Sequence, residues 1–193
     1  MKPSHASGRV ELVMDKGSLN RAALIARCRD WLGMNYYWCN LEWGYKNVTP
    51  RILVEELIDD GSGGAPRDYK FFVFDGAVNM IQVDTDRFIG HRRSLYDREW
   101  NQLPVRYSYE SSSEDADRRP PHFEDLRAAA EALERGVDFL RADFYDTGRQ
   151  LYFGEITMSP GAGMERFSSG EFDLRLGAMW KMPPLAKIIL GRA

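Results

Sequence analysis

Four side chains in the C-terminal third of the chain have types and spacings that suit the binding of a divalent cation. Arg141 and Asp143 are two residues apart, and so are Glu155 and Thr157. Residues two apart in a β-strand point to the same face of a sheet, so each pair shares a face if both segments are strands. Two carboxylates within reach of each other can share a Mg2+ ion, which prefers oxygen ligands and keeps several waters or phosphate oxygens. A charged, solvated face of an exposed hairpin is the alternative.

The residues around these four side chains predict a β-hairpin. Residues 137–146 and 150–158 both alternate in character, and Thr147-Gly148-Arg149 between them supplies a turn. Gly148 suits the positive φ that such a turn requires. The pairs expected from a three-residue loop are Tyr145 with Leu151, Asp143 with Phe153, and Arg141 with Glu155.

This register would make Asp143 and Glu155 diagonal neighbours, about 7–8 Å apart at the backbone. A slip of one residue would move the two carboxylates to opposite faces of the hairpin. The alternation of the second strand also predicts that Leu151 and Phe153 share a face with Glu155 and Thr157.

Other elements must hold this hairpin in place. Strands are expected over residues 51–58, 68–74 and 77–83. Helices are expected over residues 18–34, 122–135, 171–181 and 185–190. Ser18 is the expected N-cap of the first helix. The core stripe expected for the first helix is Leu19, Ala22, Ala23, Ala26 and Leu32, and for the second Phe123, Leu126, Ala130 and Leu133.

Composition restricts the class of protein. The chain has 193 residues, 44% of them hydrophobic, which fits one globular domain with a sizeable core. A net charge of −3 provides no basic footprint for nucleic acid, and no apolar run is long enough to span a membrane. Cys28 and Cys39 have no metal-binding spacing and fit free thiols in a reducing cytoplasm, so a cytoplasmic protein is expected.

A resemblance to a known family rests on three motifs near the hairpin. They are Arg141-Ala142-Asp143, Gly154-Glu155-Ile156-Thr157 and Ser159-Pro160-Gly161. In this order they resemble the C-terminal metal-binding signature of ATP-grasp enzymes. More narrowly, the chain from Lys2 to about Lys181 resembles the TupA-like ATP-grasp family, which is associated with teichuronopeptide and other cell-surface polysaccharide synthesis.

The resemblance implies an α+β protein with the ATP-grasp fold, in which antiparallel sheets are flanked by helices. It implies one catalytic unit over residues 1–193, with a nucleotide-clamping part up to about residue 75 and a metal-binding part with closing helices after it. In ATP-grasp proteins the lysine that resembles Lys2 follows a long N-terminal region, so a truncated N-terminal region is expected. The missing half could come from another chain, and a homo-oligomer is a second expectation.

The same resemblance implies ATP and Mg2+ as cofactors and assigns roles to individual residues. Asp143, Glu155 and Thr157 would hold the metal, although many ATP-grasp enzymes have Asn where this chain has Thr157. Arg141 and Lys2 would be catalytic, stabilising charge on the transferred phosphate. The expected nucleotide contacts are Lys2, Ser7 and Gly8 on phosphates, Glu55, Glu56 and Leu57 on adenine, Asp68 on ribose, and Lys70 on nucleotide or phosphate.

Some of these segments have plain structural explanations as well. The Ser/Gly-containing N-terminus could be a frayed end, and the acids at 55–56 could be a solvated strand end. Three arginines, Arg87, Arg92 and Arg93, could neutralise phosphates or form a basic surface cluster that balances nearby aspartates.

The activity implied is that of an ATP-dependent carboxylate–amine ligase that works through an acyl phosphate. Its substrates would be a small-molecule or glycan carboxylate and an amine acceptor, in polysaccharide or teichuronopeptide biosynthesis. The alternative is a non-catalytic or incomplete nucleotide-binding ATP-grasp remnant or subunit. A glycosyltransferase of the same pathway is the least favoured interpretation.

Overall fold

The computed structural model describes residues 1–61, 65–87, 90–112 and 118–181. The chain forms two compact units, Met1–Leu57 and Ile58–Ala193. This boundary places Asp68 and Lys70 in the same unit as the hairpin. The helix expected at 185–190 lies outside the described residues.

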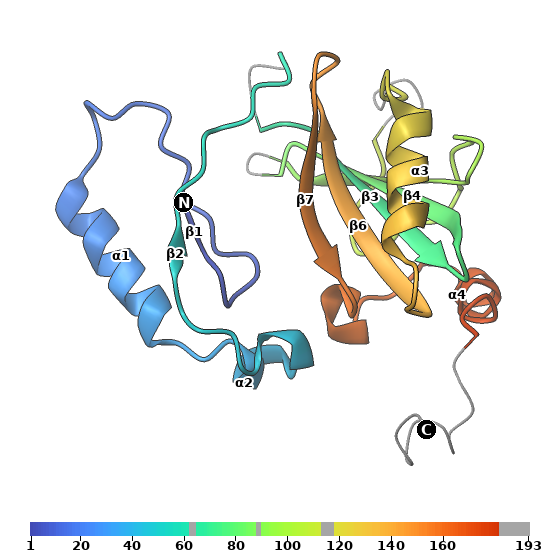
Figure 1. The fold of residues 1–193 in the computed structure, drawn as a ribbon, viewed down its shortest axis with the longest axis horizontal. Helices are drawn as coiled ribbons and strands as arrows, with labels where there is room; N and C mark the ends of the chain where they lie inside the picture. The colour runs from blue at the N-terminus through green and yellow to red at the C-terminus, as the bar shows by residue number, and fades with distance from the viewer. Residues whose placement is uncertain (62–64, 88–89, 113–117, 182–193) are drawn as a thin grey trace. The chain divides into compact units, whose positions relative to one another are not determined.

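The N-terminal unit contains short elements only. Strand β1 (Lys2–Pro3) pairs antiparallel with β2 (Ile52–Leu53), and helix α1 (Arg21–Gly33) is followed by the single turns α2 (Tyr37–Asn40) and η1 (Trp43–Tyr45) (Figure 1). The strand expected over 51–58 is therefore reduced to two residues.

Helix α1 differs from its prediction at its start and along its face. Its N-cap is Asn20, whose side chain accepts the backbone N–H of Ala23 at 3.0 Å. Ser18 was the wrong N-cap, because the helix begins only at Arg21 and the Ser18 hydroxyl donates to the Asp15 carbonyl at 3.3 Å in the preceding turn. Trp31 is the buried residue of α1. The predicted apolar stripe was wrong: alanines 22, 23 and 26 and Leu32 are exposed.

The C-terminal unit is built on a five-stranded sheet with the order β5-β4-β3-β6-β7. Every neighbouring pair in it is antiparallel. The strands are β3 (Asp68–Phe74), β4 (Ala77–Thr85), β5 (Arg92–Tyr96), β6 (Phe139–Asp146) and β7 (Leu151–Thr157). The hairpin and the two central strands are thus confirmed, and so is a mixed α and β chain with antiparallel sheets.

Helix α3 (Phe123–Leu133) covers one face of this sheet (Figure 1). Phe71, Ile81 and Leu140 from three strands pack there against the helix. The predicted core residues Phe123, Leu126 and Ala130 are confirmed, whereas Leu133 in the last turn is 40% exposed.

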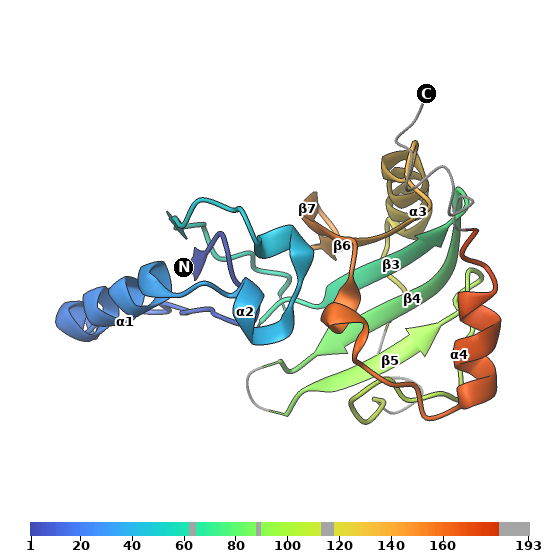
Figure 2. The same ribbon diagram turned by 90° about the horizontal axis from the view of Figure 1, so that it is seen from below.

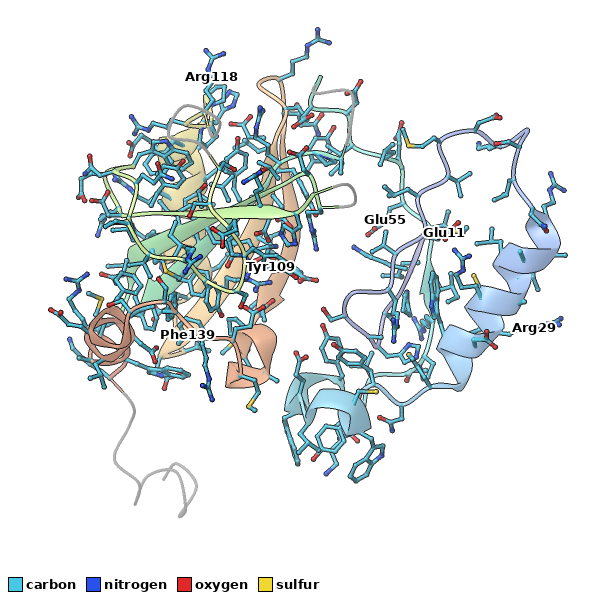
Figure 3. The ribbon with its side chains drawn as sticks, turned by 180° about the vertical axis from the view of Figure 1, so that it is seen from behind. Glu11, Arg29, Glu55, Tyr109, Arg118 and Phe139 are labelled. Carbon is cyan, nitrogen blue, oxygen red and sulfur yellow. The ribbon has the colours of Figure 1, made fainter. Side chains whose placement is uncertain are left out.

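Helix α4 (Gly170–Gly177) packs against the other face of the sheet (Figure 2). Phe172 and Leu176 of the helix join a core with Phe72 and Met80 of the central strands and Phe139 of β6. Figure 3 labels Phe139, the β6 member of this core. The helix covers only half of this face.

The remaining half of the face is polar. Along each strand, the residues that point to this face are apolar at the α4 end and charged at the other end. Strand β3 presents Phe72 and Phe74 to the α4 core and Lys70 beyond it. Strand β6 likewise presents Phe139 and then Arg141 and Asp143. Below, "the polar half-face" means this charged half of the sheet surface.

The register of the β6–β7 hairpin differs from the predicted one. Asp143 lies directly opposite Glu155, and Arg141 lies opposite Thr157. The loop contains four residues, 147–150, instead of three, because Asp146 pairs with Leu151. A β-bulge between Asp143 and Phe144 then shifts the pairing by one more residue. Two one-residue shifts restore the facing, so both carboxylates stay on the polar half-face.

Because of the bulge, Leu151 and Phe153 point to the opposite face from the predicted one. Leu151 packs on the core beneath α3. The Phe153 ring packs edge-on against the Phe144 ring on that side, with the ring centroids 5.9 Å apart. They therefore do not share a face with Glu155 and Thr157. The extra residue in β7 is Gly154, and a Cβ there would lie 3.0 Å from the Asp143 carbonyl oxygen. Glycine permits this close approach of two backbones.

Candidate functional site

A row of polar side chains crosses four strands of the sheet on the polar half-face. Glu155 lies opposite Asp143, Asp143 opposite Lys70, and Lys70 opposite Gln82. Residues directly opposite each other share a face and lie about 4.5–5.5 Å apart at Cβ. The strand order therefore joins residues that are far apart in sequence.

Lys70 occupies the centre of this row. Its Nζ donates to Asp68 Oδ2 at 2.6 Å and also to Asp143 Oδ2. All three residues are almost fully buried. A buried ammonium between two carboxylates compensates charges that would otherwise be costly to remove from water.

Arg141 joins the three side chains predicted as metal ligands. Its Nη2 atom lies 2.8 Å from Asp143 Oδ2, 3.0 Å from Thr157 Oγ1 and 3.5 Å from Glu155 Oε1. Its Nε also donates to Asp143 Oδ1 at 2.7 Å. Burial lowers the pKa of Arg141, but the nearby carboxylates of Asp143, Asp68 and Glu155 together raise it by more, so the guanidinium stays charged.

The polar half-face opens to solvent at the β7 edge. The side chain of Glu155 is 55% exposed, whereas that of Asp143 is 3% exposed. A ligand approaching this network would therefore meet Glu155 first and Asp143 beneath it.

A second group of ions on the same face was missed from sequence. Asp84 is buried; it accepts from Arg93 Nε at 2.8 Å and from Gln82 Nε2 at 2.8 Å. Burial raises the pKa of Asp84, but the nearby His91 and Arg93 outweigh that effect and hold the pKa well below its usual range. The signal in the sequence was Gln82 and Asp84, two residues apart and next to the apolar residues Ile81 and Val83 of the strand.

The three arginines considered from sequence have different environments. Arg87 Nη1 donates to Asp68 Oδ2 at 2.8 Å, so it belongs to the Lys70 network. Arg93 is buried beside Asp84, and its Nη1 reaches Glu165 Oε2 at 3.3 Å in the segment after β7. Arg92 is exposed and bonds the Ser111 carbonyl at 3.3 Å.

The remaining predicted nucleotide contacts lie in the N-terminal unit. Lys2 Nζ pairs with Glu55 Oε2 at 2.9 Å, because the β1–β2 pairing sets Lys2 opposite Leu53. Gly8 has a φ of +68° and open space around its Cα, and Ser7 is exposed. Glu56 and Leu57 are also exposed. The structure thus brings Lys2 and Glu55 together, and separately gathers Asp68, Lys70, Arg141, Asp143, Glu155 and Thr157.

The donor set on the hairpin fits a hard cation that brings ligands of its own. In the described part of the chain, no three or more His, Cys, Asp or Glu side chains gather into a metal cage. Two carboxylates and one hydroxyl nevertheless lie within 3.5 Å of a single cationic nitrogen of Arg141. Mg2+ is commonly bound by one or two carboxylates together with phosphate oxygens and waters.

An antiparallel sheet with an acid-and-arginine face is suited to binding a metal with a phosphorylated ligand. In agreement with this, the chain matches the TupA-like ATPgrasp family over residues 1–181 and belongs to that family. No curated protein and no solved structure matches the chain. Across the residues that the structure describes, no helix combines the length and apolar character needed to cross a bilayer.

Proposed function

We propose that this chain is an ATP-grasp ligase that uses Mg–ATP to activate a carboxylate as an acyl phosphate for attack by an amine. The observation that carries the proposal is the convergence of Asp143, Glu155 and Thr157 on Arg141 Nη2. Family membership supports ATP as the nucleotide.

Asp143 and Glu155, with Thr157, would hold Mg2+ at the hairpin. When bound, the metal would neutralise charge on the nucleotide phosphates. Asp143 supplies a buried carboxylate and Glu155 an accessible one, so the protein offers one fixed and one adjustable ligand. Thr157 is the weakest of the three, because a hydroxyl is a poorer neutral ligand than an amide carbonyl.

Arg141 is the residue proposed to stabilise the phosphoryl group during transfer. Its guanidinium is permanently charged and its fork already bonds two oxygens of Asp143. A positioned cation of this kind lowers the energy of negative charge that develops on transferred oxygens. Lys70 and Asp68 are proposed to contact phosphate and ribose from the neighbouring strand.

The N-terminal unit is proposed to supply the clamp over the nucleotide. Lys2 would contact a phosphate, and the backbone N–H groups around Ser7 and Gly8 would cover the β and γ phosphates, since a glycine at φ +68° permits close approach. Backbone groups near Glu55, Glu56 and Leu57 would read the adenine edge. The exposure of residues 55–57 leaves them accessible for this role.

The substrates proposed are a small-molecule or glycan carboxylate and an amine, in cell-surface polysaccharide or teichuronopeptide-type synthesis. Family membership supports this pathway assignment only at the level of the family. A non-catalytic nucleotide-binding protein is the competing outcome of the experiment below.

The test is isothermal calorimetry of Mg–ATP binding to the wild type and to Glu155→Gln, together with ATP turnover in the presence of carboxylate and amine mixtures. Glu155 is half exposed, so its amide variant keeps the fold. Loss of Mg-dependent binding and turnover in Glu155→Gln is expected, while the matched control Glu110→Gln, another exposed arginine-paired glutamate, behaves as wild type. Full activity in Glu155→Gln would refute the metal assignment. Binding without turnover of any carboxylate would identify a non-catalytic nucleotide-binding protein.

A further inference from the structure

The contact between Lys70 and Asp143 bears on how a metal could reach the site. Asp143 Oδ2 accepts from both Lys70 Nζ and Arg141 Nη2, and Asp143 Oδ1 accepts from Arg141 Nε. A carboxylate offers about four lone-pair positions, so three of them are engaged by cationic donors. A metal ion on the remaining position would lie beside the cationic groups of both Lys70 and Arg141, and their repulsion opposes its binding unless one of them moves away.

Lys70 is the donor that can leave. Arg141 is held by two parallel bonds to Asp143 and by Thr157 and Glu155 as well, and such forked contacts are geometrically restrictive. Lys70 makes one contact with Asp143 and has a second partner in Asp68 at 2.6 Å. The lysine side chain is flexible and its three donors rotate, so it can keep Asp68 while giving up Asp143.

The charges of the network balance without a metal. Three carboxylates, Asp68, Asp143 and Glu155, contact three cations, Lys70, Arg87 and Arg141. Adding a free divalent cation would leave two uncompensated positive charges in a region that is mostly buried, which is unfavourable. A metal that arrives with nucleotide phosphates brings the missing negative charge with it.

We infer that Lys70 is an internal counter-ion that blocks the metal position on Asp143 until a metal–nucleotide complex displaces it. The inference rests on the proposed function and adds an order of events: the free metal binds poorly, and the metal enters together with the nucleotide. Lys70 then contacts Asp68 and the incoming phosphate charge. Without Lys70, Asp143 and Glu155 form an acidic pair that attracts a divalent cation on its own.

A purely structural role for Lys70 makes a different prediction. In that case Lys70→Met would lower stability and leave the affinity for free metal unchanged. The two roles are separated by metal binding in the absence of nucleotide, which does not depend on catalysis.

The experiment is a titration with Mn2+, followed by the loss of the free-ion electron paramagnetic resonance signal, with and without a non-hydrolysable ATP analogue, and corrected by a protein-free titration for Mn2+ bound to the analogue alone. Removing a unit charge a few ångströms from the metal position is expected to raise affinity for free Mn2+ by at least about tenfold in Lys70→Met. Wild type is expected to bind Mn2+ well only with the analogue. The matched control is Lys181→Met, which removes a lysine paired with Asp75 at the protein surface and should leave free-metal affinity unchanged.

The possible results distinguish this inference from the proposed function. If wild type binds Mn2+ with the analogue but Lys70→Met gains no affinity for free Mn2+, the counter-ion role is refuted and the ligase site stands. If wild type binds no Mn2+ even with the analogue, the proposed function itself fails. If Lys70→Met is unstable, thermal unfolding of Lys70→Gln and of wild type is compared with and without Mn2+. Stabilisation of Lys70→Gln but not of wild type by Mn2+ supports the counter-ion role, and no stabilisation of Lys70→Gln refutes it.

Discussion

The chain contains two lysine–carboxylate pairs at its proposed ligand contacts, and they differ in their surroundings. Lys2 and Glu55 pair at 2.9 Å between two-residue strands, with side chains 37% and 57% exposed. Lys70 pairs with Asp143 inside a five-stranded sheet, with side chains 6% and 3% exposed. The first pair remains solvated and replaceable, whereas the second belongs to the structure of the sheet.

The difference follows from how many side chains each unit buries. Among the described residues of the N-terminal unit, Pro3, His5 and Trp31 are buried. The C-terminal unit has an apolar core on each face of its sheet. A surrounding apolar core lowers the local dielectric, which strengthens a compensated ion pair and penalises an unpaired charge. The proposed clamp residues can therefore rearrange at low cost, whereas the buried metal ligand Asp143 cannot.

The largest effect is expected from Asp143→Ala. It would remove the carboxylate that Lys70 and Arg141 share and leave them Asp68 and Glu155 alone, and loss of one partner from a buried ion pair costs about 3–5 kcal/mol. Urea denaturation compared with the wild type measures this cost. Asp173→Ala, an exposed aspartate on α4, is the control and should change the free energy of unfolding little. A loss below about 1 kcal/mol in Asp143→Ala would mean that the network is not buried as described.

A smaller effect with a specific pH dependence is expected from Asp84→Asn. The folded pKa of Asp84 lies below its usual value, so its charge stabilises the fold above the unfolded pKa of about 3.9 and this contribution is lost as the pH falls towards the folded pKa. At pH 7 the variant should be less stable by about 1.5–3 kcal/mol, the range for hydrogen bonds to charged groups. Denaturation at several pH values between 7 and 3 checks this. The gap between wild type and variant should shrink below pH 4, and a gap that widens there would contradict the assignment.

Gly154→Ala tests the bulge that sets Asp143 opposite Glu155. Its Cβ would lie 3.0 Å from the Asp143 carbonyl oxygen and 3.3 Å from Tyr145 Cε2. We expect a loss of about 1–3 kcal/mol, as for overpacking in a well-packed region, together with weaker metal binding through displacement of Glu155. Thermal unfolding and Mn2+ titration with the ATP analogue measure both. Gly177→Ala, where nothing lies within 4 Å of the new methyl group, is the control, and an equal response of the two variants would exclude a specific role for the bulge.

The smallest effect on stability is expected from Glu55→Ala in the exposed pair. Surface ion pairs contribute about 0–1 kcal/mol, so the midpoint of urea denaturation should hardly move. If the same variant weakens ATP-analogue binding in calorimetry, the contrast between a solvated clamp and a structural metal site is sharpened. A loss of stability as large as that of Asp143→Ala would remove the contrast.

Some elements could be predicted from local sequence patterns, whereas others depend on pairing with distant parts of the chain. The hairpin, strands β3 and β4 and the core face of α3 were predictable, because alternation and helical spacing are local properties of the sequence. The N-cap of α1 was not, because Asp15 closes a separate turn over Gly17 and Ser18, and the helix begins only after Asn20, which binds the N–H of Ala23. The extent of β2 was not either, because two residues find a partner in β1 and the following ones do not.

For the site, the spacing of two residues was enough to predict that Arg141 and Asp143 share a face, and that Glu155 and Thr157 share one. The predicted register was wrong, but both pairs still face the same side of the hairpin. The longer loop and the bulge at Gly154 moved the pairing by two residues in total, and a shift of two residues keeps the facing. The contacts of Lys70 with Asp143 and of Arg93 with Asp84 could not be predicted in this way. Those contacts depend on which strands lie side by side, and the order β5-β4-β3-β6-β7 is set by long-range packing of the two apolar cores, which no local pattern contains.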